Sequence, residues 1–218
     1  MWSKGGAGVQ KTAAKGGGKR NRAQAIREAA RGLFLQRGYK LTTIDQIARG
    51  AGYSKRSVYL DFPTKDDLFL SIATDGLELL VAQLREIPGH SLGLEEYVDC
   101  YLMTLAHFAC EKRDYFTLLA VEVTPEVIAN CSEEVRSRAR EIEQAGVALM
   151  AGRLARAVAE HQIAQADPGE VAEIVIGAAV GIIMLTLGGS QAMLAPENLN
   201  AKVRKMGRLM TRGLLAGE

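Results

Sequence analysis

The sequence predicts an all-α protein in which an N-terminal three-helix head, built around a helix-turn-helix, precedes a larger C-terminal helical body. Apolar residues recur every three or four positions along most of the chain, and no stretch alternates apolar and polar residues as a half-buried strand would. The helical stretches are separated by glycine-containing turns and by four prolines, namely Pro88, Pro125, Pro168 and Pro196. With 218 residues, 48% of them hydrophobic, the chain is long enough to bury a sizeable core.

The two parts of the chain carry opposite charge. Residues 1–65 contain 14 Lys or Arg and 3 Asp or Glu, a balance of +11, whereas residues 66–218 contain 13 and 22, a balance of −9. A basic head on an acidic body is typical of a polyanion-binding unit joined to a domain that self-associates or binds a ligand. Composition alone leaves open the alternative that these charges are solvated helix faces.

The first 20 residues predict a flexible basic arm. They hold six glycines, no acidic residue and five cations, namely Lys4, Lys11, Lys15, Lys19 and Arg20. Such a composition cannot bury enough apolar surface to order the segment by itself. An arm that follows DNA phosphates and an inert tail both fit this segment.

The first two helices of the head are expected at about 21–38 and 44–51. The apolar stripe of the first consists of Ile26, Ala29, Ala30, Leu33 and Phe34. Thr42 and Thr43 are candidate N-caps of the second. Its buried face would hold Ile44, Ile47, Ala48 and Ala51. A glycine-containing turn then leads to a third helix, which completes a helix-turn-helix.

Residues 54–62 predict a short third helix that exposes a cation. Ser54 is a favoured N-cap because its hydroxyl accepts a hydrogen bond from a backbone N–H two or three residues on. At 100° per residue, Val58 and Phe62 share one side of the helix, and Arg56 and Leu60 point away from it. Cations in a first turn oppose the helix dipole, so an external anion is the better explanation for Arg56. A guanidinium here can form two parallel hydrogen bonds to guanine in a major groove.

Six further helices complete the predicted fold. Thr64, with Asp67 three residues later, predicts a capping box that opens a fourth helix, and Pro88 with Gly89 ends it. Beyond it we expect helices at about 92–112, 114–130 with a break near Pro125, 132–161, 169–187 and 198–216.

Residues 22–69 resemble the DNA-binding domain of the TetR family of bacterial transcriptional repressors. The resemblance rests on three separated segments, AxxLFLQRGY, TTIDQIARGAG and YSKRSVYLDFPTKDDLF. Together with the composition, it divides the chain into a basic arm (1–20), a helix-turn-helix DNA-binding domain (21–66) and a helical ligand-binding and dimerisation domain (67–218).

The resemblance implies a set of DNA-binding residues in the threonine region, the third helix and the start of the fourth helix. These residues are Thr42, Thr43, Ser54, Lys55, Arg56, Ser57, Tyr59, Leu60 and Lys65. Family members often carry glycine and a histidine or tyrosine where this chain has Arg56 and Leu60, so the operator sequence does not carry over. Tyr53 replaces a more usual valine, and we expect it to pack.

The resemblance also implies a homodimer that reads a pseudo-palindromic operator and releases it when a small molecule binds the body. Two recognition helices must enter successive major grooves, which requires a rigid dimer body. The helices at about 169–187 and 198–216 each carry an apolar stripe and would build a four-helix interface. An intramolecular core is the alternative, although Gly177, Ala178 and Gly181 favour close helix approach.

The effector is expected to be largely apolar, because aromatic and methionine side chains are frequent on the middle helices, with a few polar side chains to orient it. The candidate ligand-binding residues are Tyr101, His107, Phe108, Phe116, Glu122, Gln144 and Met184. For each of the apolar ones, ordinary core packing is the alternative.

Several classes of protein are not supported by the sequence. Cys100, Cys110 and Cys131 lack metal-ligand spacing, which predicts a reduced, cytoplasmic protein with no metal or cofactor. Catalytic motifs are missing, so no enzyme is expected. The uncharged run Ile174–Ala195 suits a buried helix better than a membrane span, because Gly188, Gly189 and polar residues interrupt it. A sequence-independent architectural DNA binder that uses the basic arm is the alternative to a repressor.

Overall fold

The computed structural model describes residues 10–119, 123–163, 166–187 and 196–216. Every regular element within these residues is a helix, which confirms the predicted fold class. In order they are α1 (Gln10–Leu41), α2 (Ile44–Ala51), α3 (Lys55–Asp61), α4 (Lys65–Arg85), α5 (Leu94–Glu111), α6 (Arg113–Thr117), α7 (Pro125–Asn130), α8 (Glu133–Ala159), α9 (Pro168–Leu187), the 3-10 turn η3 (Pro196–Asn198) and α10 (Leu199–Ala216).

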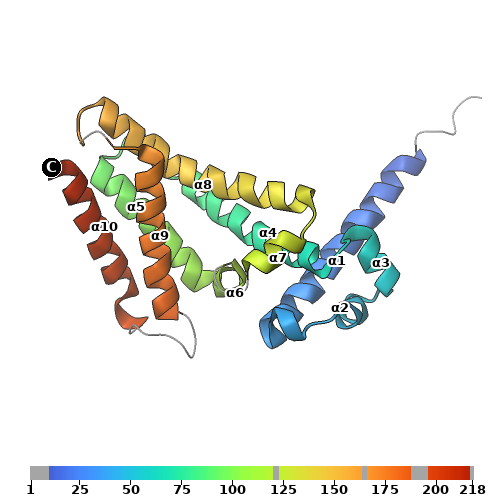
Figure 1. The fold of residues 1–218 in the computed structure, drawn as a ribbon. Helices are drawn as coiled ribbons and strands as arrows, with labels where there is room; N and C mark the ends of the chain where they lie inside the picture. Colours follow the sequence, from blue (N-terminus) through green and yellow to red (C-terminus); the bar gives the residue numbers. More distant parts are fainter. Residues whose placement is uncertain (1–9, 120–122, 164–165, 188–195, 217–218) are drawn as a thin grey trace, which may run out of the picture.

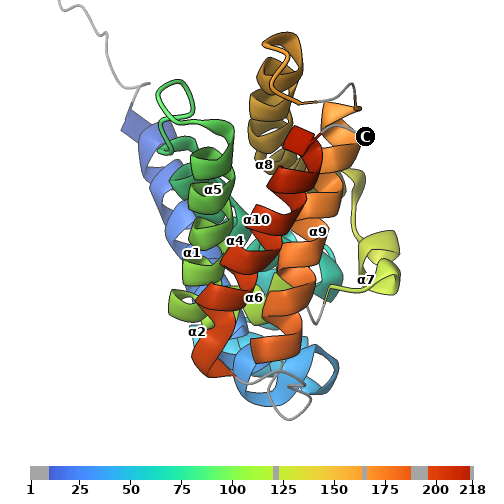
Figure 2. The same cartoon turned by 90° about the vertical axis from the view of Figure 1, so that its left-hand side faces the viewer.

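The molecule has a head and a body that share one helix. Helices α1, α2 and α3 form the head at one end, and α5, α8, α9 and α10 form the body at the other (Figure 1). Helix α4 runs from the head into the body and contacts elements of both (Figure 1). Helices α9 and α10 lie side by side on the outer side of the body (Figure 2).

The first helix differs most from its prediction. Helix α1 begins at Gln10, so residues 10–20, which we expected to form a flexible arm, are helical. Extending an existing helix adds one hydrogen bond per residue without the cost of nucleation, so a low apolar content does not prevent residues 10–20 from being helical. Residues 1–9 lie outside the described part of the chain. Gly38, with φ 77°, kinks α1 where the sequence placed its end.

Three partly exposed arginines of α1 form ion pairs with aspartates of other helices. Arg22 pairs with Asp61 of α3 at 2.7 Å, and Arg27 pairs with Asp75 of α4 at 3.2 Å. Arg31 reaches Asp114 of α6, at 2.5 Å. A part of the positive charge of the head is therefore neutralised within the protein and serves to join α1 to three other helices.

The start of α4 is capped differently from the prediction. The Thr64 hydroxyl accepts a hydrogen bond from the Asp67 backbone N–H at 2.9 Å, as expected. The buried Asp67 carboxylate does not complete the capping box. Instead it accepts hydrogen bonds from the backbone N–H and the hydroxyl of Ser132, at 2.7 and 2.9 Å. Asp67 thereby fixes the start of α8 against the start of α4.

Two apolar cores follow one another along α4. Its buried residues from Leu68 to Ile72 pack with the core of the head, whereas Leu80 and Leu84 belong to the core of the body. The change of core falls inside a continuous helix, and the domain boundary between residues 66 and 67 stays a prediction. Helix α4 therefore connects the two cores directly.

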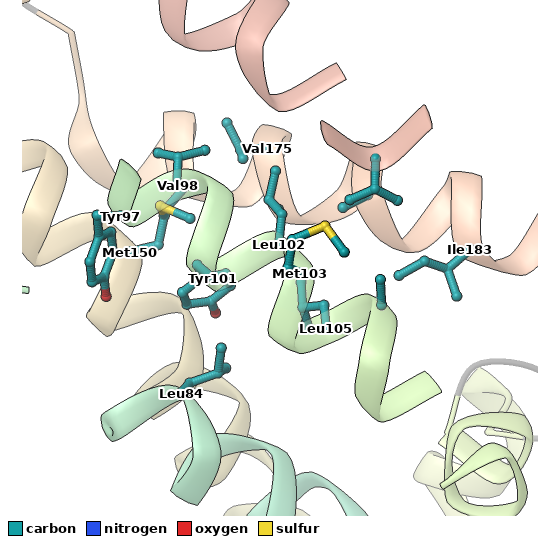
Figure 3. Close-up of a cluster of buried hydrophobic side chains, with 14 of the residues drawn as sticks. Leu84, Tyr97, Val98, Tyr101, Leu102, Met103, Leu105, Met150, Val175 and Ile183 are labelled. Atoms are coloured by element: carbon teal, nitrogen blue, oxygen red, sulfur yellow. The ribbon is translucent and has the colours of Figure 1, made fainter. Parts of the chain in front are cut away.

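The body core is built around α5. Tyr101 and Leu105 of this helix lie between Leu84 of α4 on one side and Ile183 of α9 on the other (Figure 3). The Tyr101 hydroxyl donates a hydrogen bond to the Gly146 carbonyl of α8 at 3.0 Å. Burial raises the pKa of the Tyr101 hydroxyl, so it remains a donor at neutral pH.

Gly76 is the position where α6 approaches α4 most tightly. A Cβ at Gly76 would lie 2.7 Å from the Cβ and Cδ1 atoms of Tyr115, whereas one at Gly152 of α8 would meet nothing within 4 Å. We expect Gly76→Ala to lower the melting temperature, because overpacking costs about 1–3 kcal/mol and exceeds the gain in helix propensity.

Gly152→Ala is the matched control for this substitution. It should raise the melting temperature slightly, since only the gain in helix propensity acts there. Calorimetry of both variants checks the prediction, and equal shifts would show that α6 is not packed against Gly76.

Candidate functional site

Helix α3 is delimited by two local signals. Gly52, in the left-handed conformation with φ 73°, ends α2 and turns the chain. The Ser54 hydroxyl then accepts a hydrogen bond from the Ser57 backbone N–H at 3.1 Å, as predicted for an N-cap. The three-helix head thus places α3 on its surface with a defined start.

The faces of α3 are the predicted ones. Val58 is fully buried and Phe62 is 6% exposed, whereas Leu60 is 63% and Tyr59 is 45% exposed. Arg56 is exposed on the same outward side. Among the residues that the structure describes, no hydrogen bond or ion pair involves the Arg56 guanidinium. It is available to an external partner.

Lys55 is exposed and near an acidic group. Its ammonium lies 3.2 Å from the Asp45 carboxylate of α2, and both side chains are more than half exposed. An exposed pair of this kind contributes little to stability and exchanges readily. Lys55 can therefore leave Asp45 for a stronger anion. Tyr53, which we expected to pack, is 38% exposed close to this surface.

The two adjacent threonines have different environments. Thr43 is exposed and caps α2, with the reciprocal hydrogen bond from its backbone N–H to the Gln46 side chain at 2.9 Å. Thr42 is 1% exposed, and its hydroxyl donates to the Gly38 carbonyl at 2.9 Å. Thr42 does not share the exposed surface of the predicted site, because its side chain is used to close the kinked end of α1.

Lys65 lies below this surface and ties α4 to the α1–α2 turn. Its ammonium donates to the carbonyls of Tyr39 and Thr42 at 3.0 and 3.1 Å. It also lies 4.0 Å from the centroid of the Tyr39 ring. Partial burial lowers the pKa of Lys65, and the neighbouring Asp66 carboxylate partly offsets this shift. Lys65 therefore has a structural role, independent of any contact with a DNA phosphate.

Lys65→Ala is expected to lower the free energy of unfolding by about 1–3 kcal/mol, because two carbonyls lose a charged donor. Thermal unfolding measures this effect. Lys40→Ala, which removes an exposed cation from the last turn of α1, is the control and should leave stability nearly unchanged. Equal stability of the Lys65→Ala variant and the unaltered protein would mean that the two carbonyl contacts are dispensable.

The body contains a cavity of about 390 Å³. Its volume falls within the range of small-molecule sites. Apolar side chains dominate the lining, which comprises Leu70, Thr74, Leu77, Leu80, Val81, Leu84, Tyr101, Leu105, Phe108, Phe116, Leu119, Val123, Ile128, Arg136, Ala139, Arg140, Glu143, Gly146, Val147, Ile176 and Val180.

Three of the predicted ligand-binding residues, Tyr101, Phe108 and Phe116, line this cavity. Two of the predicted polar partners, His107 and Gln144, do not. His107 and Gln144 are exposed elsewhere on α5 and α8, because a helix turns successive residues by 100° and each lies off the inward face. Met184 is half-buried on α9 away from the lining, and Glu122 lies outside the described residues.

The charged lining residues were missed by the sequence analysis. Arg136, Arg140 and Glu143 line the cavity from α8. They recur at i, i+4 and i+7 together with Val147, so charged and apolar residues share one helix face. Charge on an otherwise apolar helix face was the available signal.

A second apolar surface lies on α9 and α10. A groove between them is lined by Val171, Ile174, Val175, Met210, Gly213 and Leu214. Helix α9 is the one described helix that is long and apolar enough to span a membrane by length and composition, and 28% of its most apolar stretch is buried. Within one chain it packs against α5, α8 and α10.

The cysteines differ in exposure. Cys131 is buried, and burial raises the pKa of its thiol to about 12. Cys100 and Cys110 are exposed. In the part of the chain that the structure describes, no group of three or more His, Cys, Asp or Glu side chains is placed to hold a metal ion.

Comparison with known proteins shows what this geometry is similar to. The three-helix head has the arrangement of a helix-turn-helix and is joined to a helical body that contains a cavity. Residues 26–72 match the family model "Bacterial regulatory proteins, tetR family". The N-terminal part of the chain is therefore similar to the DNA-binding segment of TetR-family transcriptional regulators.

Curated relatives agree with this assignment. The HTH-type transcriptional regulator YhgD of Bacillus subtilis is 31% identical over 53% of this chain and 59% of its own length. RutR of Escherichia coli K12 is 37% identical over 39% of this chain and 44% of its own length. The chain spans about half the length of the curated relatives it matches.

Solved structures show the same fold along most of the chain. PfmR of Thermus thermophilus has a TM-score of 0.65 at 21% identity and covers 87% of this chain and 98% of its own. FadR of Bacillus subtilis, solved in complex with stearoyl-CoA, has a TM-score of 0.69 at 17% identity over 87% of this chain and 98% of its own.

Proposed function

We propose that this protein is a ligand-responsive repressor that binds a pseudo-palindromic operator as a homodimer and releases it when a small molecule occupies the body cavity. The DNA-binding residues are Thr43, Ser54, Lys55, Arg56, Ser57, Tyr59 and Leu60, with Lys65 in a supporting position. Thr42 is left out because its side chain is buried.

The exposed guanidinium of Arg56 is the observation that carries the proposal. It projects from the side of α3 opposite the buried Val58, and the rest of the head supplies no acceptor for it among the described residues. Arginine is the most frequent reader of guanine in a major groove. Leu60 beside it suits the methyl group of thymine, and Tyr59 suits a phosphate oxygen.

The face of α9 and α10 supports the homodimer. Ile174 is 53% and Leu209 is 65% exposed in a single chain, so apolar surface remains uncovered. Cβ atoms built at Gly177, Gly181 and Gly213 would meet nothing within 4 Å inside the chain. These glycines have no packing role within one subunit, and they would allow a partner helix to approach closely.

The contacts of α6 support a mechanical coupling between the cavity and the head. Phe116 of this helix lines the cavity. The adjacent Tyr115 lies under the Arg31 guanidinium, 5.2 Å from its ring centroid, and Asp114 pairs with the same arginine of α1. A ligand that displaces Phe116 would therefore move a helix that is bonded to the head.

The nature of the effector is supported by the lining and by one structural neighbour. The cavity is mostly apolar. The Bacillus subtilis FadR structure holds stearoyl-CoA, a ligand with a long apolar chain. A largely apolar effector in the cytoplasm, where the operator would be, is consistent with both.

Selection of duplexes from a random library, followed by footprinting at fixed salt, tests the proposal. A repressor should enrich a sequence with two related half-sites about 34–36 Å apart or a multiple of that distance. Equal affinity for all duplexes would instead identify a sequence-independent architectural DNA binder that relies on its basic N-terminal segment.

A further inference from the structure

The body cavity has more hydrogen-bond donors than its own residues satisfy. Two of its polar side chains are already committed: the Thr74 hydroxyl donates to the Leu70 carbonyl at 2.8 Å, and the Tyr101 hydroxyl donates to the Gly146 carbonyl at 3.0 Å. The remaining polar lining residues are Arg136, Arg140 and Glu143, all on α8. The polar groups with which the cavity can bind a ligand therefore lie on α8.

Arg136 has a donor without an acceptor. Its Nε atom is buried and has no hydrogen-bond partner among the described residues. Arginine has five donors and no acceptor, so only an acceptor from elsewhere can satisfy this atom. A buried donor without a partner is unfavourable, and binding of a matching acceptor removes that cost.

Both arginines are held by one carboxylate on their outer side. Glu133 accepts hydrogen bonds from Nη2 of Arg136, at 2.8 Å, and from Nη2 of Arg140. The Glu133 side chain is 65% exposed, so this network is solvated. It fixes the two guanidinium groups beside one another at the cavity wall and leaves their other nitrogens for a ligand. Exposed Glu143 is the remaining charged lining residue.

We propose that the body cavity takes an apolar molecule that carries an anionic group, a carboxylate or a phosphate, and that Arg136 and Arg140 bind that group. The inference rests on the proposed role of the cavity as the effector site and specifies the class of effector. The apolar walls from α4, α5 and α6 bury the body of the molecule, and the two guanidinium groups select its charged end.

Anionic amphiphiles differ from neutral lipids in that they can form charge-assisted hydrogen bonds with the two arginines. Guanidinium groups bind carboxylates and phosphates through paired, charge-assisted hydrogen bonds, whereas an alcohol of equal length offers one neutral acceptor. Glu133 competes with the ligand for the same cations. Removal of its charge should therefore tighten the binding of an anionic ligand.

Titration calorimetry of the purified full-length protein tests the inference with matched pairs of ligands. Octanoate and dodecanoate, each below its micellar concentration, are compared with octanol and dodecanol, and dodecyl phosphate distinguishes phosphate from carboxylate. We expect octanoate to bind about tenfold or more tightly than octanol. At twelve carbons, we expect the same margin over dodecanol for whichever of dodecanoate and dodecyl phosphate binds more tightly. Glu133→Gln should increase this preference.

Variants of α8 locate the anionic group. Arg136→Gln should remove most of the preference for the anion, and Arg136→Lys should retain a part of it. Arg138→Gln is the matched control: Arg138 is on the same helix and pairs with Glu78 at 2.6 Å, but it does not line the cavity. This variant should keep the full preference.

Three outcomes overturn the inference: equal affinity for alcohols and anions, equal loss in Arg136→Gln and Arg138→Gln, or no binding by any of these chains. Release of operator DNA is measured separately. Binding of the anion without release contradicts the proposed repressor mechanism and leaves the ligand class standing. Release by alcohols and anions alike keeps the mechanism and overturns the ligand class.

Discussion

Arg56→Ala is expected to weaken operator binding by about 1–3 kcal/mol and to relax the preference at one base pair of each half-site. The guanidinium is exposed on α3 opposite the buried Val58, so its loss removes a base contact without disturbing the core of the head. Competition between the selected operator and duplexes with a single base pair changed, at constant salt, measures both effects.

The control for Arg56→Ala is Arg85→Ala, which removes an exposed cation from the last turn of α4. This change should leave the affinity and the base preference nearly unaltered, because α4 ends in the body. If Arg56→Ala weakens all duplexes equally, Arg56 contacts a phosphate instead of a base. If its affinity is unchanged, α3 does not present this residue to DNA.

Ile174→Asp is expected to convert the proposed homodimer to monomers and to reduce operator affinity by about 100-fold or more, since linked heads gain effective concentration. Ile174 is 53% exposed in a single chain and lines the groove between α9 and α10. Each subunit should still fold, but a dimer would bury two unpaired carboxylates in an apolar interface. Analytical ultracentrifugation and operator titration measure the two effects.

Leu79→Asp serves as the control for Ile174→Asp. Leu79 is 45% exposed on α4, so the same kind of apolar residue is replaced by the same charge on a different surface. Dimerisation and operator binding should persist in this variant. A dimeric Ile174→Asp protein would show that the subunits associate through another face.

The sequence predicted local structure well where local chemistry decides it. Thr43, Ser54 and Thr64 each cap the helix that was expected to start after them. A side-chain oxygen bonds a backbone N–H within three residues, so the whole interaction is contained in a short window. The inward direction of Val58 follows in the same way from the turn angle of the helix.

Predictions failed where a side chain could choose between partners far apart in the chain. Asp67 was expected to complete its own capping box and instead caps α8 at Ser132. His107 and Gln144 were chosen as polar groups of the cavity by residue type, and both point away from it. The local sequence pattern predicts neither the partner of Asp67 nor the orientation of His107 and Gln144, because both depend on which helix faces pack together.

By itself the sequence determined the all-helical class, the starts of α2, α3 and α4 and the outward direction of Arg56, because hydrogen bonds and helix geometry over a few residues fix them. Only the tertiary structure decided that Thr42 is buried, that α1 arginines pair with aspartates of other helices, and that Arg136 and Arg140 line the cavity. These depend on contacts between residues far apart in the chain, whose geometry is set by the packing of whole helices.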